Sequence, residues 1–370
     1  MKICYLSNSA IGSQYASSIQ IVKMCEAFSE LGNDVTLITR ASSKKKNFFK
    51  IYDVKYKYSV KILEKFKKFP LGMRYYLFSL ISIYVSFKFK PEIYMTRNFF
   101  TCFLLVLLKK KVILELHHDL DMEGRIVRFL VKKLKYINSK YILKIIAISH
   151  GVKEVYINKY SVNTNKILVL PSGSSIKKKF TFNHNKNFFK IGYLGSLYKS
   201  RGSSLIYKLA KIDKHNEYYL YGDINNLKNY KKYSLIKNLH LNGWVPYREI
   251  SKILSKMDIL LMPYISNIKV AGNVGDITQF TSPLKLFDYL SAGKIIICSD
   301  FNILREAIKE NINAIFVKNY TNPYSWKNEI LKLENQPHKQ FIISRNNHKL
   351  SKSYSLKFRA KKILQELKLN

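Results

Sequence analysis

Residues 281–298 read TSPLKLFDYLSAGKIIIC, and this stretch indicates the class of fold. Its first part is typical of a short helix. Ser282 can cap the first turn, Pro283 suits the first helical position, and Gly293 can take the left-handed conformation that closes the last turn. The isoleucine run at 295–297 is typical of a strand buried on both faces of a parallel sheet. A helix that leads directly into such a strand favours an α/β fold.

Lys285 and Asp288 are the polar residues of interest on this predicted helix. A helix start carries partial positive charge, so a lysine in the first turn is normally disfavoured. A bound anion, usually phosphate, would reconcile the two; alternatively, the lysine side chain extends into water. Asp288 follows one turn later on the same side, where its carboxylate could accept hydrogen bonds from ribose hydroxyls. The pair would suit the two halves of a nucleoside diphosphate.

Strand and helix patterns alternate from the N-terminus onward. Residues 2–7 and 35–39 favour strands, 16–31 favours a helix, and Gly12 lies in the first loop. This order is the start of a doubly wound, nucleotide-binding type of fold. No GxGxxG sequence is present, so a dinucleotide is not indicated.

A second sheet is predicted to begin with the strand at 190–195 and to close with 314–317. The chain has 370 residues, which is too long for one ordinary core and suits two domains. In the loop after the strand at 190–195, Arg201 offers a fork of donors between Gly195 and Gly202. The alternative is a surface arginine in a loop.

Two adjacent histidines follow the predicted strand at 112–116. Ligands of open α/β sheets bind at the carboxyl ends of the strands, which makes His117 and His118 candidates for a site. The alternative is a hydrogen-bonded loop. No set of acidic or histidine residues nearby has the spacing of metal ligands.

The stretch around Asp288 resembles the PLKLFEYMAAGKPIIASD segment of GT-B glycosyltransferases of glycosyltransferase family 4. Residues 17–39, SSIQIVKMCEAFSELGNDVTLIT, are similar to the opening of many members, and residues 195–202 resemble the family's GSLYKGRG loop. The resemblance covers nearly the whole chain and is loosest between residues 42 and 84. It implies an α/β fold of the GT-B type, with two Rossmann-like doubly wound domains facing across a cleft and a C-terminal helix crossing back.

The resemblance also implies roles for individual residues. Asp288 would bind the ribose of a sugar nucleotide, Arg201 and Lys285 its diphosphate, and the backbone near Trp244 its base. His117 would contact the donor sugar as the catalytic-site histidine, with His118 as the alternative. The donor-binding residues expected from these motifs are Gly12, Ser196, Arg201, Trp244, Val245, Ser282, Pro283, Leu284, Lys285 and Asp288.

One position departs from the family pattern. Members often have two acidic residues eight positions apart, the first of which contacts the sugar. Counting back from Asp288 gives Phe280, so Asp276 is the nearest acidic substitute. Many members also have an arginine at Ser196, and Lys199 or Lys285 could supply the missing charge.

The expected domains are residues 1–178, an acceptor-side domain, residues 186–345, a nucleotide-sugar-binding domain, and residues 346–370, the helix that returns to the first domain. We expect no signal peptide, because the apolar run at residues 3–6 is short, and no membrane span, because no apolar run reaches about 20 residues. Four widely separated cysteines in apolar contexts indicate core residues in a reducing compartment. We expect a cytoplasmic protein.

The charge is extreme, with 64 basic against 24 acidic residues and a net charge of +40. Such a charge points to an anionic partner, and no nucleic-acid-binding motif accompanies it. We therefore expect peripheral binding to an anionic membrane surface; the alternative is solvated surface lysine that reflects composition alone.

Family members are retaining enzymes that need no metal, so we expect no metal or other cofactor beyond the nucleotide-sugar co-substrate. The expected function is transfer of a hexose to a glycan or lipid-linked acceptor in capsule or lipopolysaccharide synthesis. The alternatives are a GT-B sugar-nucleotide epimerase and a basic nucleic-acid-binding protein.

Overall fold

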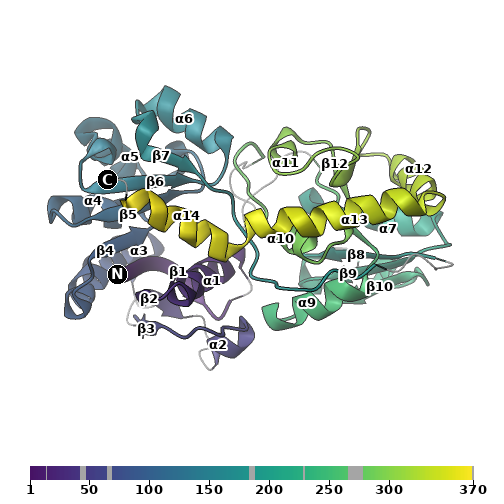
Figure 1. Ribbon diagram of the computed structural model, residues 1–370, viewed down its shortest axis with the longest axis horizontal. Helices are drawn as coiled ribbons and strands as arrows, with labels where there is room; N and C mark the ends of the chain where they lie inside the picture. The colour runs from purple at the N-terminus through teal and green to yellow at the C-terminus, as the bar shows by residue number, and fades with distance from the viewer. Residues whose placement is uncertain are drawn as a thin grey trace. The chain divides into compact units, whose positions relative to one another are not determined.

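A computed structural model of the chain describes residues 1–13, 15–41, 47–64, 69–182, 188–227, 230–265 and 278–368. The chain divides into two compact units, shown in Figure 1. The first unit comprises Met1–Gly173, Phe280–Ser282 and Leu356–Asn370; the second comprises Ser174–Gln279 and Pro283–Ser355. The two units therefore divide after Gly173 and again after Ser355. The boundaries expected from the sequence motifs are residues 178 and 345.

The first unit contains a seven-stranded parallel sheet in the order β3-β2-β1-β4-β5-β6-β7. Its strands are β1 (Lys2–Ile11), β2 (Asp34–Ala41), β3 (Ser59–Ile62), β4 (Ile93–Thr96), β5 (Val112–Leu116), β6 (Ile142–Ala147) and β7 (Ile167–Val169). Its helices are α1 (Ala16–Glu30), α2 (Phe48–Ile51), α3 (Leu71–Ser86), α4 (Phe99–Leu107), α5 (Arg125–Leu134), α6 (His150–Tyr160) and α14 (Leu356–Lys368). This sheet confirms the first Rossmann-like domain.

Helix α14 is built from the last residues of the chain, yet it belongs to the first unit. It packs against α1 and is drawn in yellow in front of the sheet in Figure 1. The predicted return of a C-terminal helix to the first domain is confirmed, although the helix begins at Leu356 and not at residue 346. The preceding helix, α13 (Pro337–Ser351), belongs to the second unit.

The second unit contains a six-stranded parallel sheet in the order β10-β9-β8-β11-β12-β13. Its strands are β8 (Lys190–Leu194), β9 (Glu217–Tyr221), β10 (Leu239–Asn242), β11 (Ile259–Met262), β12 (Ile295–Ser299) and β13 (Ala314–Val317). Its other helices are α7 (Ser203–Ile212), α8 (Tyr230–Tyr233), α9 (Tyr247–Lys256), α10 (Leu284–Ser291), α11 (Asn302–Arg305) and α12 (Pro323–Glu334). The second Rossmann-like domain is thus confirmed.

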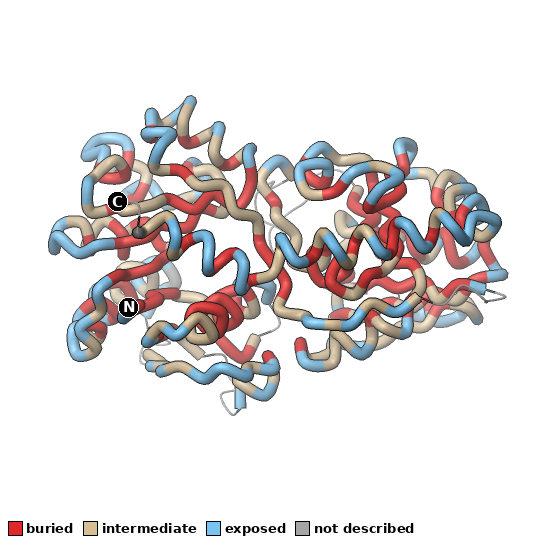
Figure 2. Tube along the Cα trace, viewed as in Figure 1, coloured by how far each residue is buried: buried red, intermediate tan, exposed pale blue. Residues whose placement is uncertain are grey.

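Each unit has its own apolar core, and Figure 2 shows the sheet strands as the mainly buried part of the trace. Strand β12 is buried at every position, as the isoleucine run predicts. All four cysteines are buried with free thiols. Among the described helices, none is long and apolar enough to cross a membrane.

The start of α10 differs from the prediction in detail. Pro283 is the N-cap residue itself, and the helix begins at Leu284. Ser282 does not cap it, because its hydroxyl accepts a hydrogen bond of 2.8 Å from the amide of Ser172 instead. Within the described residues no side chain caps this helix start. Gly293 does adopt the left-handed conformation after the helix, with φ at 61°.

Candidate functional site

Lys285 lies in the first turn of α10, with its ammonium group packed into aromatic surroundings. Its Nζ donates a hydrogen bond of 2.9 Å to the hydroxyl of Tyr193 and lies 4.0 Å from the centroid of that ring. Gly195, at the end of β8, makes room for it, since a Cβ there would lie 2.8 Å from Nζ. Burial, followed by the nearby charge of Arg201, lowers the pKa of Lys285 well below its usual range. The lysine is therefore held in the protein rather than extended into water.

Arg201 is brought to the same place by the turn that precedes α7. The guanidinium carbon of Arg201 lies 5.2 Å from the ring centroid of Tyr264, and Lys285 Nζ lies 5.4 Å from it. Gly202 has φ at 85° and sits against the carbonyl of Pro263, just beyond β11, where no side chain would fit. Two cations thus converge at the carboxyl ends of β8 and β11, where open α/β sheets bind ligands.

Asp288 is one turn along α10 and is 8% exposed. Its Oδ1 accepts hydrogen bonds from the hydroxyl of Ser174 at 2.6 Å and from that of Tyr247 at 3.1 Å. Tyr247 begins α9, directly after the loop that carries Trp244 and Val245. Tyr247 therefore links Asp288, predicted to bind the ribose, by a hydrogen bond to the loop predicted to bind the base. Neither Ser174 nor Tyr247 is predicted from sequence, because no local pattern places a hydroxyl beside a distant carboxylate.

His117 follows β5 in the first unit, where its imidazole Nε2 lies 2.8 Å from Oε1 of Glu115. The Arg97 guanidinium donates to the same oxygen at 2.9 Å. Burial, followed by the charge of Arg97, lowers the pKa of His117 to about 4. The imidazole is therefore neutral at neutral pH, with Nε2 carrying the hydrogen that it donates to the carboxylate and Nδ1 left as an acceptor.

Glu115 is the centre of this cluster, and its side chain is fully buried. Although burial alone would raise it, Arg359 and Arg97 hold the pKa of Glu115 well below its usual range. Arg359 comes from α14, lies 3.3 Å from Oε1, and also donates to the backbone carbonyl of Pro171 at 2.9 Å. The C-terminal helix thus completes the charge cluster behind His117. Its sequence pattern predicts the helix but gives no sign of this contact.

His118, the alternative to His117, is turned toward its own loop. Its Nδ1 lies 3.0 Å from the carbonyl of Asp119, and its Nε2 lies 3.4 Å from Glu123. Gly12 has φ at 82°, and its amide donates to the hydroxyl of Tyr52 at 2.9 Å. In this structure the Gly12 amide is therefore hydrogen-bonded within the first unit, to Tyr52.

The remaining predicted positions lie in two loops and at one helix start. Trp244 is exposed and Val245 half-buried after β10, and Ser196 is exposed after β8, where its carbonyl accepts from Tyr193 at 2.7 Å. Ser282, Pro283 and Leu284 lead into α10. Asp276 lies outside the described residues. The carbonyl of Phe280 accepts from Ser149 at 3.4 Å.

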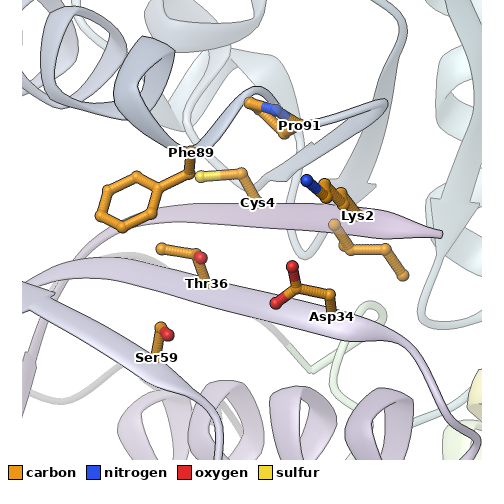
Figure 3. Close-up of a pocket in the computed structure, with 8 residues that line it drawn as sticks. Lys2, Cys4, Asp34, Thr36, Ser59, Phe89 and Pro91 are labelled. Carbon is orange, nitrogen blue, oxygen red and sulfur yellow. The ribbon is translucent and has the colours of Figure 1, made fainter.

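One pocket of about 110 Å³ lies elsewhere, at the starts of β1, β2 and β3. Figure 3 shows Lys2 and Cys4 on β1 beside Asp34 and Thr36 on β2. Because ligands of these folds bind at the opposite ends of the strands, we assign this pocket no role. No cluster of three or more potential metal ligands occurs in the described part of the chain.

Two Rossmann-like units, with cations gathered at the strand ends of the second, define a GT-B fold. A family model described as Glycosyltransferase Family 4 matches residues 18–177, and one described as Glycosyl transferases group 1 matches residues 174–350. The chain belongs to the GT-B glycosyltransferases of the family 4 type. This membership does not favour the nucleic-acid-binding or epimerase alternatives. The comparison with curated protein sequences gave no match.

Solved structures share the fold at low identity. HepE from Anabaena, solved with UDP and glucose, is 13% identical with a TM-score of 0.72, and the match covers 100% of both chains. A glycosyltransferase from Rickettsia africae is 14% identical with a TM-score of 0.70, over 99% of this chain and 97% of that one. WaaG, described as a glycosyltransferase involved in lipopolysaccharide biosynthesis, is 12% identical with a TM-score of 0.63, over 98% of both chains.

Proposed function

We propose that the chain is a retaining hexosyltransferase that uses a nucleotide-diphosphate sugar without a metal. The observation that carries this proposal is the convergence of Lys285 and Arg201 on Tyr264 beside the uncapped start of α10. Burial and the neighbouring Arg201 disfavour the charged form of Lys285, so an anion that binds both cations would relieve the repulsion. A diphosphate has the charge to do this. HepE was solved with UDP and glucose, which supports a donor of this class.

The same two cations would serve the chemistry. As the bond from the sugar to the diphosphate breaks, negative charge develops on the leaving group. Preorganised cations and helix-start amides stabilise such charge more in the transition state than in the substrate. Lys285, Arg201 and the backbone N–H groups of Ser282 and Leu284, which flank Pro283, would fill this role. Asp288 would bind the ribose, with the backbone at Trp244 and Val245 near the base, and Ser196 completing the phosphate loop.

In the first unit we propose that His117 contacts the donor sugar. With Nε2 donating to Glu115, Nδ1 can only accept, so it would receive a hydrogen bond from a sugar hydroxyl. The neutral imidazole does not act as a nucleophile in this proposal. Gly12 would approach the donor through its backbone, and His118 and Asp276 are the further candidates for contact with the sugar.

The proposed acceptor is a hydroxyl of a glycan or lipid-linked intermediate in capsule or lipopolysaccharide synthesis, on the cytoplasmic face of the membrane. The description of WaaG supports this direction. The net charge of +40 favours attraction to an anionic lipid surface.

A thermal-shift series with nucleoside diphosphates tests the donor site. A ligand that binds the folded state raises the melting temperature, and Lys285→Ala and Arg201→Ala should each abolish that rise. The control is Lys211→Ala, which removes an exposed lysine of α7. An unchanged shift in both site variants would refute the phosphate assignment. Product analysis then tests the reaction itself. Product formed in the presence of a chelator would support metal independence, and the anomeric configuration of that product reports retention. Incubation without acceptor distinguishes transfer from epimerisation, because an epimerase needs no acceptor.

A further inference from the structure

Helix α3 buries Phe78 and Ile83, as a surface helix should, yet it also buries three serines and exposes several large apolar residues. The residues it turns inward include Ser79, Ser82 and Ser86, all fully buried. Those it turns outward include Leu80 and Tyr84, the latter 71% exposed. A surface helix of a globular protein normally faces its apolar stripe to the core and its polar residues to water.

The buried serines are satisfied locally, which explains how the helix tolerates them. Ser79 Oγ donates to the carbonyl of Tyr75 at 3.0 Å and accepts from Thr101 of α4 at 2.9 Å. Ser82 and Ser86 donate to carbonyls of the preceding turn at 3.1 and 2.6 Å. The serines let α3 pack closely beside Phe78 and Ile83, while further large apolar residues lie on its outer side.

The neighbouring helices continue the outward apolar surface. Helix α5 buries Val127 and Val131 but exposes the larger Ile126 and Phe129, the latter 59% exposed. Leu107 at the end of α4 is 60% exposed. Helix α4 contacts both α3 and α5, so these positions belong to one layer of the first unit (Figure 1). We call this surface the α3–α5 face; exposed large apolar residues gathered on one layer are typical of a surface that binds something.

Basic side chains accompany the apolar ones on this layer. Lys88 follows α3, Lys110 and Lys111 follow α4, and Lys132 and Lys133 lie in the last turn of α5, all exposed. Lys110 Nζ lies 5.7 Å from the ring centroid of Phe87, which joins the end of α3 to the loop after α4. The α3–α5 face therefore combines protruding apolar groups with excess positive charge.

We propose that the α3–α5 face docks on an anionic lipid bilayer, with Leu80, Tyr84, Ile126 and Phe129 entering the interface and the lysines contacting lipid phosphates. Apolar insertion together with basic contacts is the combination that binds such surfaces. A second copy of the chain is a poorer occupant, because a symmetric contact would bring like charges together. Nucleic acid would leave the aliphatic groups without a partner. The inference deepens the proposed function by naming the surface that meets the membrane.

The test is sedimentation of the full chain with vesicles of phosphatidylglycerol and phosphatidylcholine in equal parts, and with phosphatidylcholine alone. The variant is Leu80→Gln/Tyr84→Gln/Ile126→Gln/Phe129→Gln. We expect its partitioning onto anionic vesicles to fall by about tenfold or more, since each apolar contact contributes separately. Lys110→Gln/Lys111→Gln should weaken binding at low salt and reduce its salt dependence. The matched control is Leu235→Gln/Tyr324→Gln, which removes exposed apolar residues of the second unit.

The inference is supported if the wild type and the control bind anionic vesicles and the variant with four substitutions does not. Equal binding by all three proteins, or wild-type binding to neutral vesicles alone, would overturn it. The inference would also be overturned, in favour of self-association, by another result: the wild type binds no vesicles but forms a dimer, and the four substitutions abolish that dimer. The nucleoside-diphosphate thermal shift, measured without vesicles, reports separately on the donor site, so the two proposals can fail independently.

Discussion

Oε1 of Glu115 lies 2.8 Å from Nε2 of His117, and the same oxygen faces the guanidinium groups of Arg97 and Arg359. The carboxylate balances two arginines in a buried place. Its removal would leave both positive charges without that partner, which is costlier than the loss of a surface ion pair.

We therefore predict that Glu115→Gln lowers the free energy of unfolding by about 3–5 kcal/mol. Asp121→Asn is the control, because Asp121 pairs with Lys132 and Lys159 at the surface; this substitution should change stability by less than about 1 kcal/mol. Urea denaturation of both variants measures the difference. If both variants lost less than about 1 kcal/mol of unfolding free energy, the buried carboxylate would contribute no more to stability than a surface ion pair.

His117 should make stability depend on pH. Its pKa is about 4 in the folded protein against an ordinary 6.5, so the unfolded chain takes up this proton first as pH falls. This contribution is complete above about pH 6.5 and is lost progressively toward pH 4. His117→Gln should flatten that part of the stability curve, because it removes the group that takes up the proton. Urea midpoints at several pH values test this, and an unchanged slope in the His117 variant would contradict it.

Lys285 should take up protons when a diphosphate binds. Burial and Arg201 lower its pKa in the free protein, and an anion beside it raises the pKa again. At a pH where part of the population is neutral, binding therefore draws protons from the buffer. Calorimetric titrations in two buffers of different ionisation enthalpy measure the uptake. Lys285→Met should remove it, and equal uptake in wild type and variant would exclude Lys285 as the source.

Asp288 should discriminate between ribose and deoxyribose. If its carboxylate accepts hydrogen bonds from ribose, Asp288→Asn should weaken binding of a nucleoside diphosphate by about tenfold, the value of one charge-assisted hydrogen bond. The affinity for the corresponding 2′,3′-dideoxynucleoside diphosphate, which lacks both ribose hydroxyls, should differ little between Asp288→Asn and the wild type. Tyr247→Phe is the companion variant, because it removes a hydroxyl that now occupies Oδ1. Equal losses for both nucleotides with Asp288→Asn would argue for a purely structural carboxylate.

The sheets were within reach of sequence analysis, because apolar runs such as β4, β5 and β13 are bounded by clear turns. The edge strand β3 was not, since its alternating exposure gives only a short, weak pattern. The convergence of Lys285 with Arg201 follows in outline from strand order, as both lie beyond carboxyl strand ends. The hydroxyl partners of Asp288 and the contact from Arg359 to Glu115 depend on tertiary packing between distant segments, which no local spacing encodes.

Gly202 should be the least replaceable of the glycines that the structure describes in the second unit. It combines φ at 85° with a close approach to the backbone of Pro263, so an alanine there is strained and also overlaps a carbonyl oxygen. We predict that Gly202→Ala costs at least about 2–3 kcal/mol of stability and displaces Arg201, which weakens nucleoside-diphosphate binding. Gly72→Ala, in α3 of the first unit, is the control, because a Cβ at that position meets nothing within 4 Å. Chemical denaturation and thermal shift on both variants measure the two effects. If Gly202→Ala matched its control in both, the turn before α7 would not be what positions the arginine.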